Sequence, residues 1–161
     1  MIKYLLLVSI LFLSGLSYAS DYERSKFGSG WADIDKDCQN TRQETLISMS
    51  RSPVQFATDK GCRVISGNWV SPFTSKTILD ASKVDIDHVV PLKWAWLNGA
   101  DKWPHEKRIE FANDSFNLIV VELSLNRQKG AKGLDEWLPP KNQEAHKERF
   151  KAVWEKYNSA N

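Results

Sequence analysis

Apolar and polar positions in the middle of the chain predict two neighbouring strands. Residues 83–90 (KVDIDHVV) alternate with period two and predict a strand that ends near His88. Asp85 and Asp87 lie on one face of that strand, and the histidine lies on the other. Residues 116–123 (FNLIVVEL) are almost wholly apolar, which is typical of a strand buried on both faces.

Helical periodicity and turn residues account for most of the remaining chain. Apolar positions at helical spacing predict helices near residues 39–50, 91–99, 104–114 and 124–130, and after Pro140. Upstream, residues 54–58 and 62–70 predict two short strands of a hairpin, and 71–76 have turn chemistry. Residues 20–36 are polar, so we expect them to be loosely ordered at their start. The pattern predicts one α+β domain without repeats.

The first residues have the order of regions that marks a secretory signal peptide. Lys3 provides a positive charge, residues 4–16 form a short apolar core, and small residues stand at 17–19. A core of about 13 residues is too short for a comfortable membrane span, although an uncleaved anchor or a buried helix is the alternative. We expect residues 1–19 to be removed. The mature domain, residues 20–161, would then be secreted or periplasmic, without stable membrane association.

The net charge is close to zero. The chain has 22 Lys and Arg against 20 Asp and Glu, and removal of Lys3 leaves 21 against 20, or +1. Bulk charge therefore does not indicate a nucleic-acid partner, and any attraction to an anion must be local. Arg127, Lys129 and Lys132 form one basic cluster. This cluster either contacts a phosphate backbone or is a solvated helix face.

Cys38 and Cys62 are the only cysteines in the sequence. In an exported protein an even pair of cysteines is typical of a disulfide. A structural zinc site would need more cysteine and histidine ligands than this chain can gather. We therefore expect a Cys38–Cys62 disulfide, which would close a loop of about 25 residues and stabilise the fold by roughly 3 kcal/mol.

Polar side chains that suit phosphodiester hydrolysis recur along the chain. Histidine, here His88, has an ordinary pKa near the working pH and can take a proton from an attacking water. Such hydrolysis also needs a cation that neutralises the phosphate. Mg²⁺ keeps several waters, so the oxygens of Asp87 and Asn126 would suffice to hold it if the short helix packs across the two strands. The HExxH and GxSxG motifs of other hydrolases are absent from the sequence.

Three ordered motifs carry a family resemblance. "DIDHVVPLKWAWLNGADKW" (85–103), "FANDSFNLIVVELSLNRQKGAKG" (111–133) and "EWLPP" (136–140) resemble the HNH, His-Me finger or ββα-metal, endonucleases. More narrowly, they are similar to small secreted nucleases related to the GmrSD restriction-enzyme C-terminal domain. The resemblance covers about residues 36–140. It implies a ββα-metal core at about 83–132, flanked by helices and a short N-terminal hairpin.

The resemblance also implies roles for individual side chains. His88 would be the general base, and Asp87 and Asn126 would bind the metal. Asn117 would hold the loop and the histidine in place. Asp85 would be either a support for the metal ligands or a structural charge.

Oxygen ligands favour Mg²⁺, with Mn²⁺ as a second choice and Zn²⁺ disfavoured. The sequence as a whole predicts a monomeric exported endonuclease with little sequence specificity and DNA as its main substrate. An RNA-preferring nuclease and a non-catalytic nucleic-acid-binding module remain alternatives, and an inhibitor partner stays open. His105 and His146 are expected on helix surfaces, without a role in the site.

Overall fold

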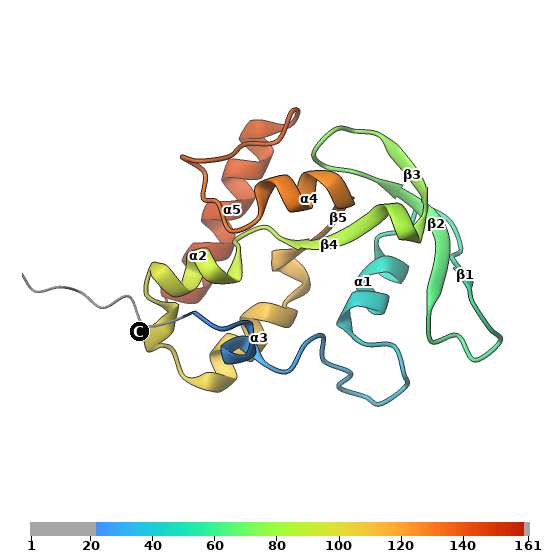
Figure 1. Cartoon of the computed structure of the whole chain (residues 1–161), viewed down its shortest axis with the longest axis horizontal. Coiled ribbons are helices and arrows are strands. Elements are labelled where there is room, and N and C mark those ends of the chain that lie inside the picture. The colour runs from blue at the N-terminus through green and yellow to red at the C-terminus, as the bar shows by residue number, and fades with distance from the viewer. Residues whose placement is uncertain (1–21, 160–161) are drawn as a thin grey trace, which may run out of the picture.

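The centre of the molecule is an antiparallel strand pair followed directly by a short helix. The computed structural model describes residues 22–159, so the expected signal peptide lies outside the described residues. Strand β4 (Val84–His88) pairs with β5 (Leu118–Glu122) in continuous register, from Val84 opposite Glu122 to His88 opposite Leu118. Helix α4 (Leu123–Lys129) begins at the residue after β5 and lies beside β4 (Figure 1). Both strands are confirmed.

A second sheet has the order β1-β2-β3, and its strands are antiparallel. Strands β1 (Gln55–Phe56) and β2 (Val64–Val70) are the expected hairpin. Strand β3 (Thr77–Asp80) was not predicted, so the expected two-strand hairpin is in fact a three-stranded sheet. The sequence "TILD" has too few alternating positions to predict a strand, and β3 is defined by its pairing with β2.

The predicted helices are present with shifted ends. They are α1 (Thr41–Ser48), α2 (Leu92–Leu97), α3 (His105–Asn113) and α5 (Gln143–Asn158). Short 3-10 turns, η1 (Arg24–Phe27), η2 (Ala81–Lys83), η3 (Ala100–Lys102) and η4 (Ser115–Asn117), connect the longer elements. No helix within residues 22–159 has the length and apolar character needed to cross a membrane. The fold is therefore mixed α+β, as expected.

The β4–β5 pair separates two apolar clusters. Ile119 and Val121 pack with α2, α3 and α5, whereas Leu118 and Val120 pack with α1 and the three-stranded sheet. Burial on both faces explains why residues 116–123 lack polar alternation. It also fixes the ends of β4 and β5 between two packed layers, which is where the candidate site lies.

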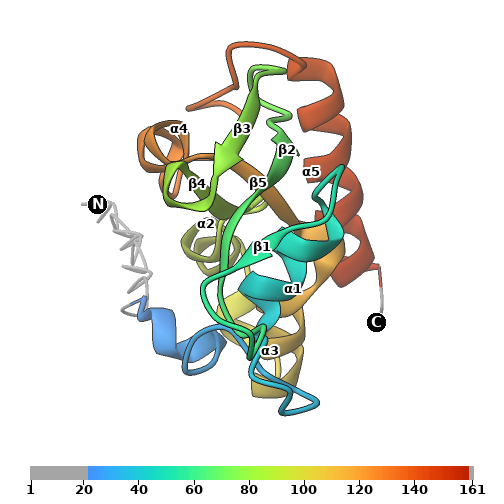
Figure 2. The same cartoon turned by 90° about the vertical axis from the view of Figure 1, so that its right-hand side faces the viewer.

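Phe27 anchors the segment before α1 to the core, and residues 20 and 21, at the start where loose order was expected, lie outside the described residues. Phe27 is fully buried and its ring lies 6.2 Å from those of Trp96 and Phe111. Arg108 Nε donates to the Lys26 carbonyl over 2.9 Å. Figure 2 shows η1 lying against α3. The polar composition of this segment concealed one aromatic anchor, Phe27.

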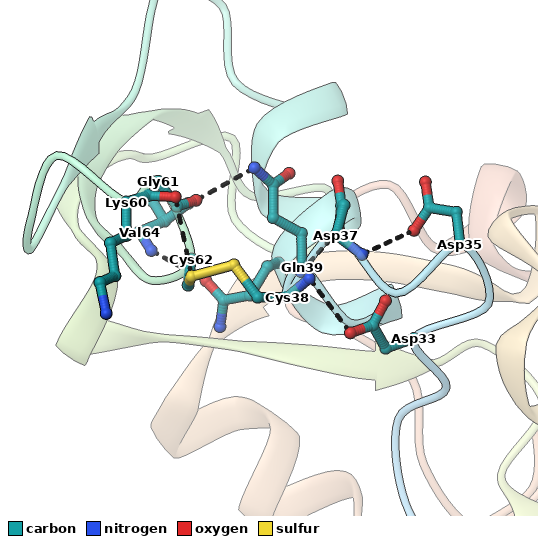
Figure 3. Close-up of a disulfide and its surroundings, with 10 residues drawn as sticks. Asp33, Asp35, Asp37, Cys38, Gln39, Lys60, Gly61, Cys62 and Val64 are labelled. Carbon is teal, nitrogen blue, oxygen red and sulfur yellow. Dashed lines mark hydrogen bonds between the residues drawn. A yellow bond between two sulfur atoms is a disulfide. The ribbon is translucent and has the colours of Figure 1, made fainter.

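The disulfide between Cys38 and Cys62 is confirmed, with 5.2 Å between the two Cα atoms. It ties the loop before α1 to the loop before β2 (Figure 3). Replacing both cysteines with serine is expected to lower the free energy of unfolding by about 3 kcal/mol, because the unfolded chain gains freedom. Urea unfolding at neutral pH measures this, with reduced wild type as the control. Equal stability of the oxidised and cysteine-free proteins would contradict the expectation.

His146 is buried, not on the surface as expected from the sequence. Its ring packs against Phe73 and Trp137 at centroid distances of 5.6 and 6.0 Å. Burial lowers the pKa of His146 to about 4, and the charges of Lys129 and Arg149 add to this effect.

Burial of His146 predicts acid sensitivity. The unfolded chain takes up a proton near pH 6.5 and the folded chain only near pH 4. The stabilisation is therefore complete above pH 6.5 and is lost as the pH falls towards 4, by about 3 kcal/mol at most. His146→Leu should remove this loss, whereas His105→Leu, at an exposed histidine, should not. Urea unfolding at pH 7 and pH 4.5 measures it. An identical pH dependence in His146→Leu and wild type would refute the expectation.

Candidate active site

A cavity of about 290 Å³ opens where the end of β4 meets η1, α2 and α4. Three of the residues singled out by sequence, Asp87, His88 and Asn126, line this one cavity. The remaining lining residues are Tyr22, Arg24, Ile86, Pro91, Leu92, Lys93, Gly130 and Ala131. The structure therefore brings a histidine, a carboxylate and an amide together from two elements, while the first turn of the described chain closes another side.

The imidazole of His88 is held so that one nitrogen remains available. Its Nε2 lies 2.8 Å from the carbonyl oxygen of Ala112, which requires the proton on Nε2 in the neutral ring. No group within residues 22–159 forms a hydrogen bond with Nδ1. Burial lowers the pKa of His88 to about 3, opposed by the Ala112 contact and reinforced by nearby positive charges. The ring is therefore neutral at ordinary pH, and its pKa lies below the value near the working pH that the sequence suggested.

Trp31 covers one face of this histidine. The two rings are stacked, with 5.2 Å between centroids and 4° between planes. The next residue, Ala32, is fixed by its N–H to the Asn113 side-chain oxygen at 2.9 Å, and its carbonyl accepts from the Thr41 N–H at 2.7 Å. Trp31 was not predicted as a site residue, because it lies in a polar segment far from the histidine in sequence. Asn113, at the end of α3, helps to hold the loop of Trp31.

Asp87 forms a buried ion pair with Lys129. The Lys129 ammonium lies 2.9 Å from both carboxylate oxygens and 2.6 Å from the carbonyl oxygen of His88. The side chains of Lys129 and Asp87 are only 1% and 5% exposed. Burial raises the pKa of Asp87 to about 6 against the opposing effect of Lys129. This placement corrects the expectation that Lys129 contacts phosphate from an exposed position, since its ammonium is buried and paired.

Asn126 is oriented by Asp85. The amide nitrogen of Asn126 donates to an Asp85 carboxylate oxygen over 2.8 Å, and the other oxygen of Asp85 accepts from the Ile86 N–H. The amide oxygen of Asn126 has no donor in the described part of the chain. Asp85 thus acts on Asn126 without lining the cavity.

Asn117 lies outside the cavity and ties the strand ends together. It is fully buried, and its side-chain oxygen accepts from the Val90 N–H over 2.9 Å. Its amide nitrogen contacts the carbonyls of Val90 and Phe111, each at 3.4 Å. These bonds connect the residues after His88 to the start of β5. The role expected for Asn117, holding the loop, is compatible with this position.

Arg127 is exposed but lines a different cavity, with Ser82, Lys83 and Glu122 among its neighbours. The cations that line the His88 cavity are instead Arg24 and Lys93, which sequence analysis did not single out. Their positions at the cavity depend on how separate segments pack together, so the local sequence pattern did not predict them.

The oxygen atoms that line the cavity suit a divalent cation that prefers oxygen ligands. Asp87 offers a carboxylate and Asn126 an amide oxygen within one cavity. Mg²⁺ is commonly held by one or two such groups together with water. Another acidic group, Asp33, Asp35 and Asp37, is exposed on the loop beside the disulfide and lies outside this cavity (Figure 3).

Comparison with known proteins gives two matches. The family described as "GmrSD restriction endonucleases, C-terminal domain" matches residues 34–159. An "Uncharacterized secreted protein" of Arthroderma benhamiae is 45% identical over 121 residues, which is 74% of this chain and 57% of that protein. The chain thus spans little more than half the length of this relative. No solved structure matches.

Proposed function

This chain belongs to the family of GmrSD restriction endonuclease C-terminal domains, and we propose that it is a metal-dependent endonuclease of the HNH type. The observation that carries the proposal is the single cavity that His88, Asp87 and Asn126 line. The β4–β5 pair followed by α4 supports assignment to the ββα-metal class. Its reaction is hydrolysis of phosphodiester bonds in nucleic acid.

His88 acts as the general base in this proposal. Nδ1 takes a proton from a water whose oxygen bonds to the phosphorus, while the bond from phosphorus to the 3′ oxygen breaks. The departing 3′ oxygen takes a proton from solvent water, so the products are a 5′-phosphate and a 3′-hydroxyl. The Ala112 carbonyl, which accepts from Nε2, stabilises the imidazolium that forms. Trp31 keeps the ring in its plane, so the lone pair of Nδ1 retains its direction.

Asp87 and Asn126 would hold the divalent cation, and Asp85 would orient Asn126. A bound Mg²⁺ would neutralise charge on the phosphate and stabilise the departing oxygen. Lys129 contacts both oxygens of Asp87, and each of these oxygens has a second lone pair that could bind a cation. Mn²⁺ prefers the same ligand types, and Zn²⁺ is less suited to an all-oxygen pair.

The proposed nuclease acts in an oxidising compartment, either the periplasm or the extracellular space. The expected signal peptide and the disulfide agree with export, and the fungal relative is described as secreted. The substrate we propose is DNA with little sequence specificity, cleaved by a monomer. RNA is the alternative substrate, because no described feature of the cavity selects a sugar. A non-catalytic binding module is the third reading, and the complete set of base and ligands argues against it.

Cleavage assays test this function directly. The disulfide-bonded protein without residues 1–19 is incubated with supercoiled plasmid and with RNA, in Mg²⁺, Mn²⁺, Zn²⁺ or EDTA. We expect plasmid fragmentation in Mg²⁺ and none in EDTA. An RNA rate at least tenfold above the DNA rate would shift the assignment to a ribonuclease. Intact substrates in every metal, from folded protein, would contradict the nuclease assignment. Tight binding without cleavage would favour the binding module.

A further inference from the structure

Two cationic side chains line the His88 cavity without forming an ion pair with any described residue. Asp87 is compensated by the buried Lys129, so this pair adds no net charge. Arg24 and Lys93 line the same cavity. Among residues 22–159, no carboxylate lies within 4.0 Å of either cationic group. The cavity is therefore positive at its rim, although the whole protein is nearly neutral.

Arg24 is held beside the candidate base by packing. It is the first residue of η1, and Phe27, the last, is fully buried in the core. The guanidinium carbon lies 6.0 Å from the centre of the Trp31 ring, which in turn is stacked on His88. That distance is at the outer limit of a cation–π contact. The backbone of Arg24 is therefore fixed near the imidazole by Phe27, while its side chain is exposed.

Lys93 lines the same cavity from helix α2. It is the second residue of α2, between residues that fix the helix: Leu92, Ala95 and Trp96 are buried. Pro91 and Leu92 also line the cavity. The backbone of Lys93 is thus rigidly placed, while its side chain is exposed. Two anchored segments, far apart in sequence, each present one exposed cation at the cavity.

We propose that Arg24 and Lys93 form a subsite for backbone phosphates of nucleic acid beside the His88 cavity. The inference deepens the proposed nuclease function and rests on it. A guanidinium binds phosphate oxygens through paired N–H donors, and an ammonium acts as a point charge. Neither contact reads the base, so the subsite contributes affinity and register without sequence preference. Arg24 and Lys93 would contact the phosphate backbone in place of Lys129, whose ammonium is buried and paired with Asp87.

Salt dependence of binding tests the subsite. Each protein–phosphate contact on duplex DNA contributes about 0.9 to the slope of log affinity against log salt. A fluorescent DNA duplex is titrated with the full-length mature protein carrying His88→Ala, so that no cleavage occurs. We expect Arg24→Gln and Lys93→Gln each to reduce the slope by about 0.9, and the double variant by about 1.8. Arg24→Lys keeps the charge and should keep the slope.

The control is Lys26→Gln, an exposed lysine of the same 3-10 turn that does not line the cavity. It should leave the slope unchanged. An unchanged slope in Arg24→Gln and Lys93→Gln would overturn the subsite and leave the nuclease proposal standing. If the protein with an intact His88 cleaves no nucleic acid, but Arg24→Gln and Lys93→Gln still reduce the slope, the subsite stands and the nuclease proposal fails. Absence of any DNA or RNA binding would overturn the subsite.

Discussion

Replacing His88 with alanine is expected to lower kcat/KM for DNA cleavage by a factor on the order of 10²–10⁴. The structure gives the reason: Nε2 is engaged with the Ala112 carbonyl, and Nδ1 has no hydrogen bond with any described residue. Among the described residues that line the cavity, alanine removes the only imidazole. The loss is measured under single-turnover conditions with a labelled duplex in Mg²⁺.

A matched histidine variant separates this effect from general damage. His105 is exposed at the start of α3 and does not line the cavity, so His105→Ala should retain wild-type kcat/KM. Thermal unfolding of both variants confirms that they are folded. Wild-type activity in a folded His88→Ala protein would remove the histidine from the mechanism.

Replacing Lys129 with methionine is expected to lower the free energy of unfolding by about 3–5 kcal/mol. The substitution removes the ammonium that contacts both oxygens of Asp87 and the His88 carbonyl. The carboxylate of Asp87 is then left buried without a counter-charge, which is the costly arrangement. Urea unfolding in EDTA, with the disulfide intact, measures the change.

The control for this substitution is Lys132→Met in the loop after α4. Lys132 is exposed and its ammonium contacts only the Gln128 carbonyl among the described residues, so the cost should stay below about 0.5 kcal/mol. Adding Asp87→Leu to Lys129→Met should recover part of the loss, because no buried charge then remains. Equal stability of Lys129→Met and Lys132→Met would show that the Asp87 pair does not stabilise the fold.

Local pattern predicted the part of the site that lies on regular elements. Alternation placed Asp85 and Asp87 on the same face of β4, and both meet side chains of α4. The apolar run of β5 predicted a strand buried on both faces, which is what the two core clusters require. Because α4 follows β5 without a loop, Asn126 comes to lie next to Asp85.

The remaining features depend on contacts between distant segments. Trp31 and Arg24 lie in a polar stretch whose position is set by Phe27 and by the bond from Ala32 to Asn113. Strand β3 exists through its pairing with β2. Lys129 looked like a phosphate contact because its sequence neighbours are basic, but the helix turns it inward to Asp87. Periodicity shows which residues share a face, and it does not show which partner covers that face.

We propose that one cavity holds both His88, as the general base, and the divalent cation. The most direct test is anomalous diffraction from crystals of the disulfide-bonded protein soaked in Mn²⁺. We predict a manganese peak coordinated by Asp87 and Asn126, beside His88. A peak at Asp33, Asp35 and Asp37 alone would contradict this assignment.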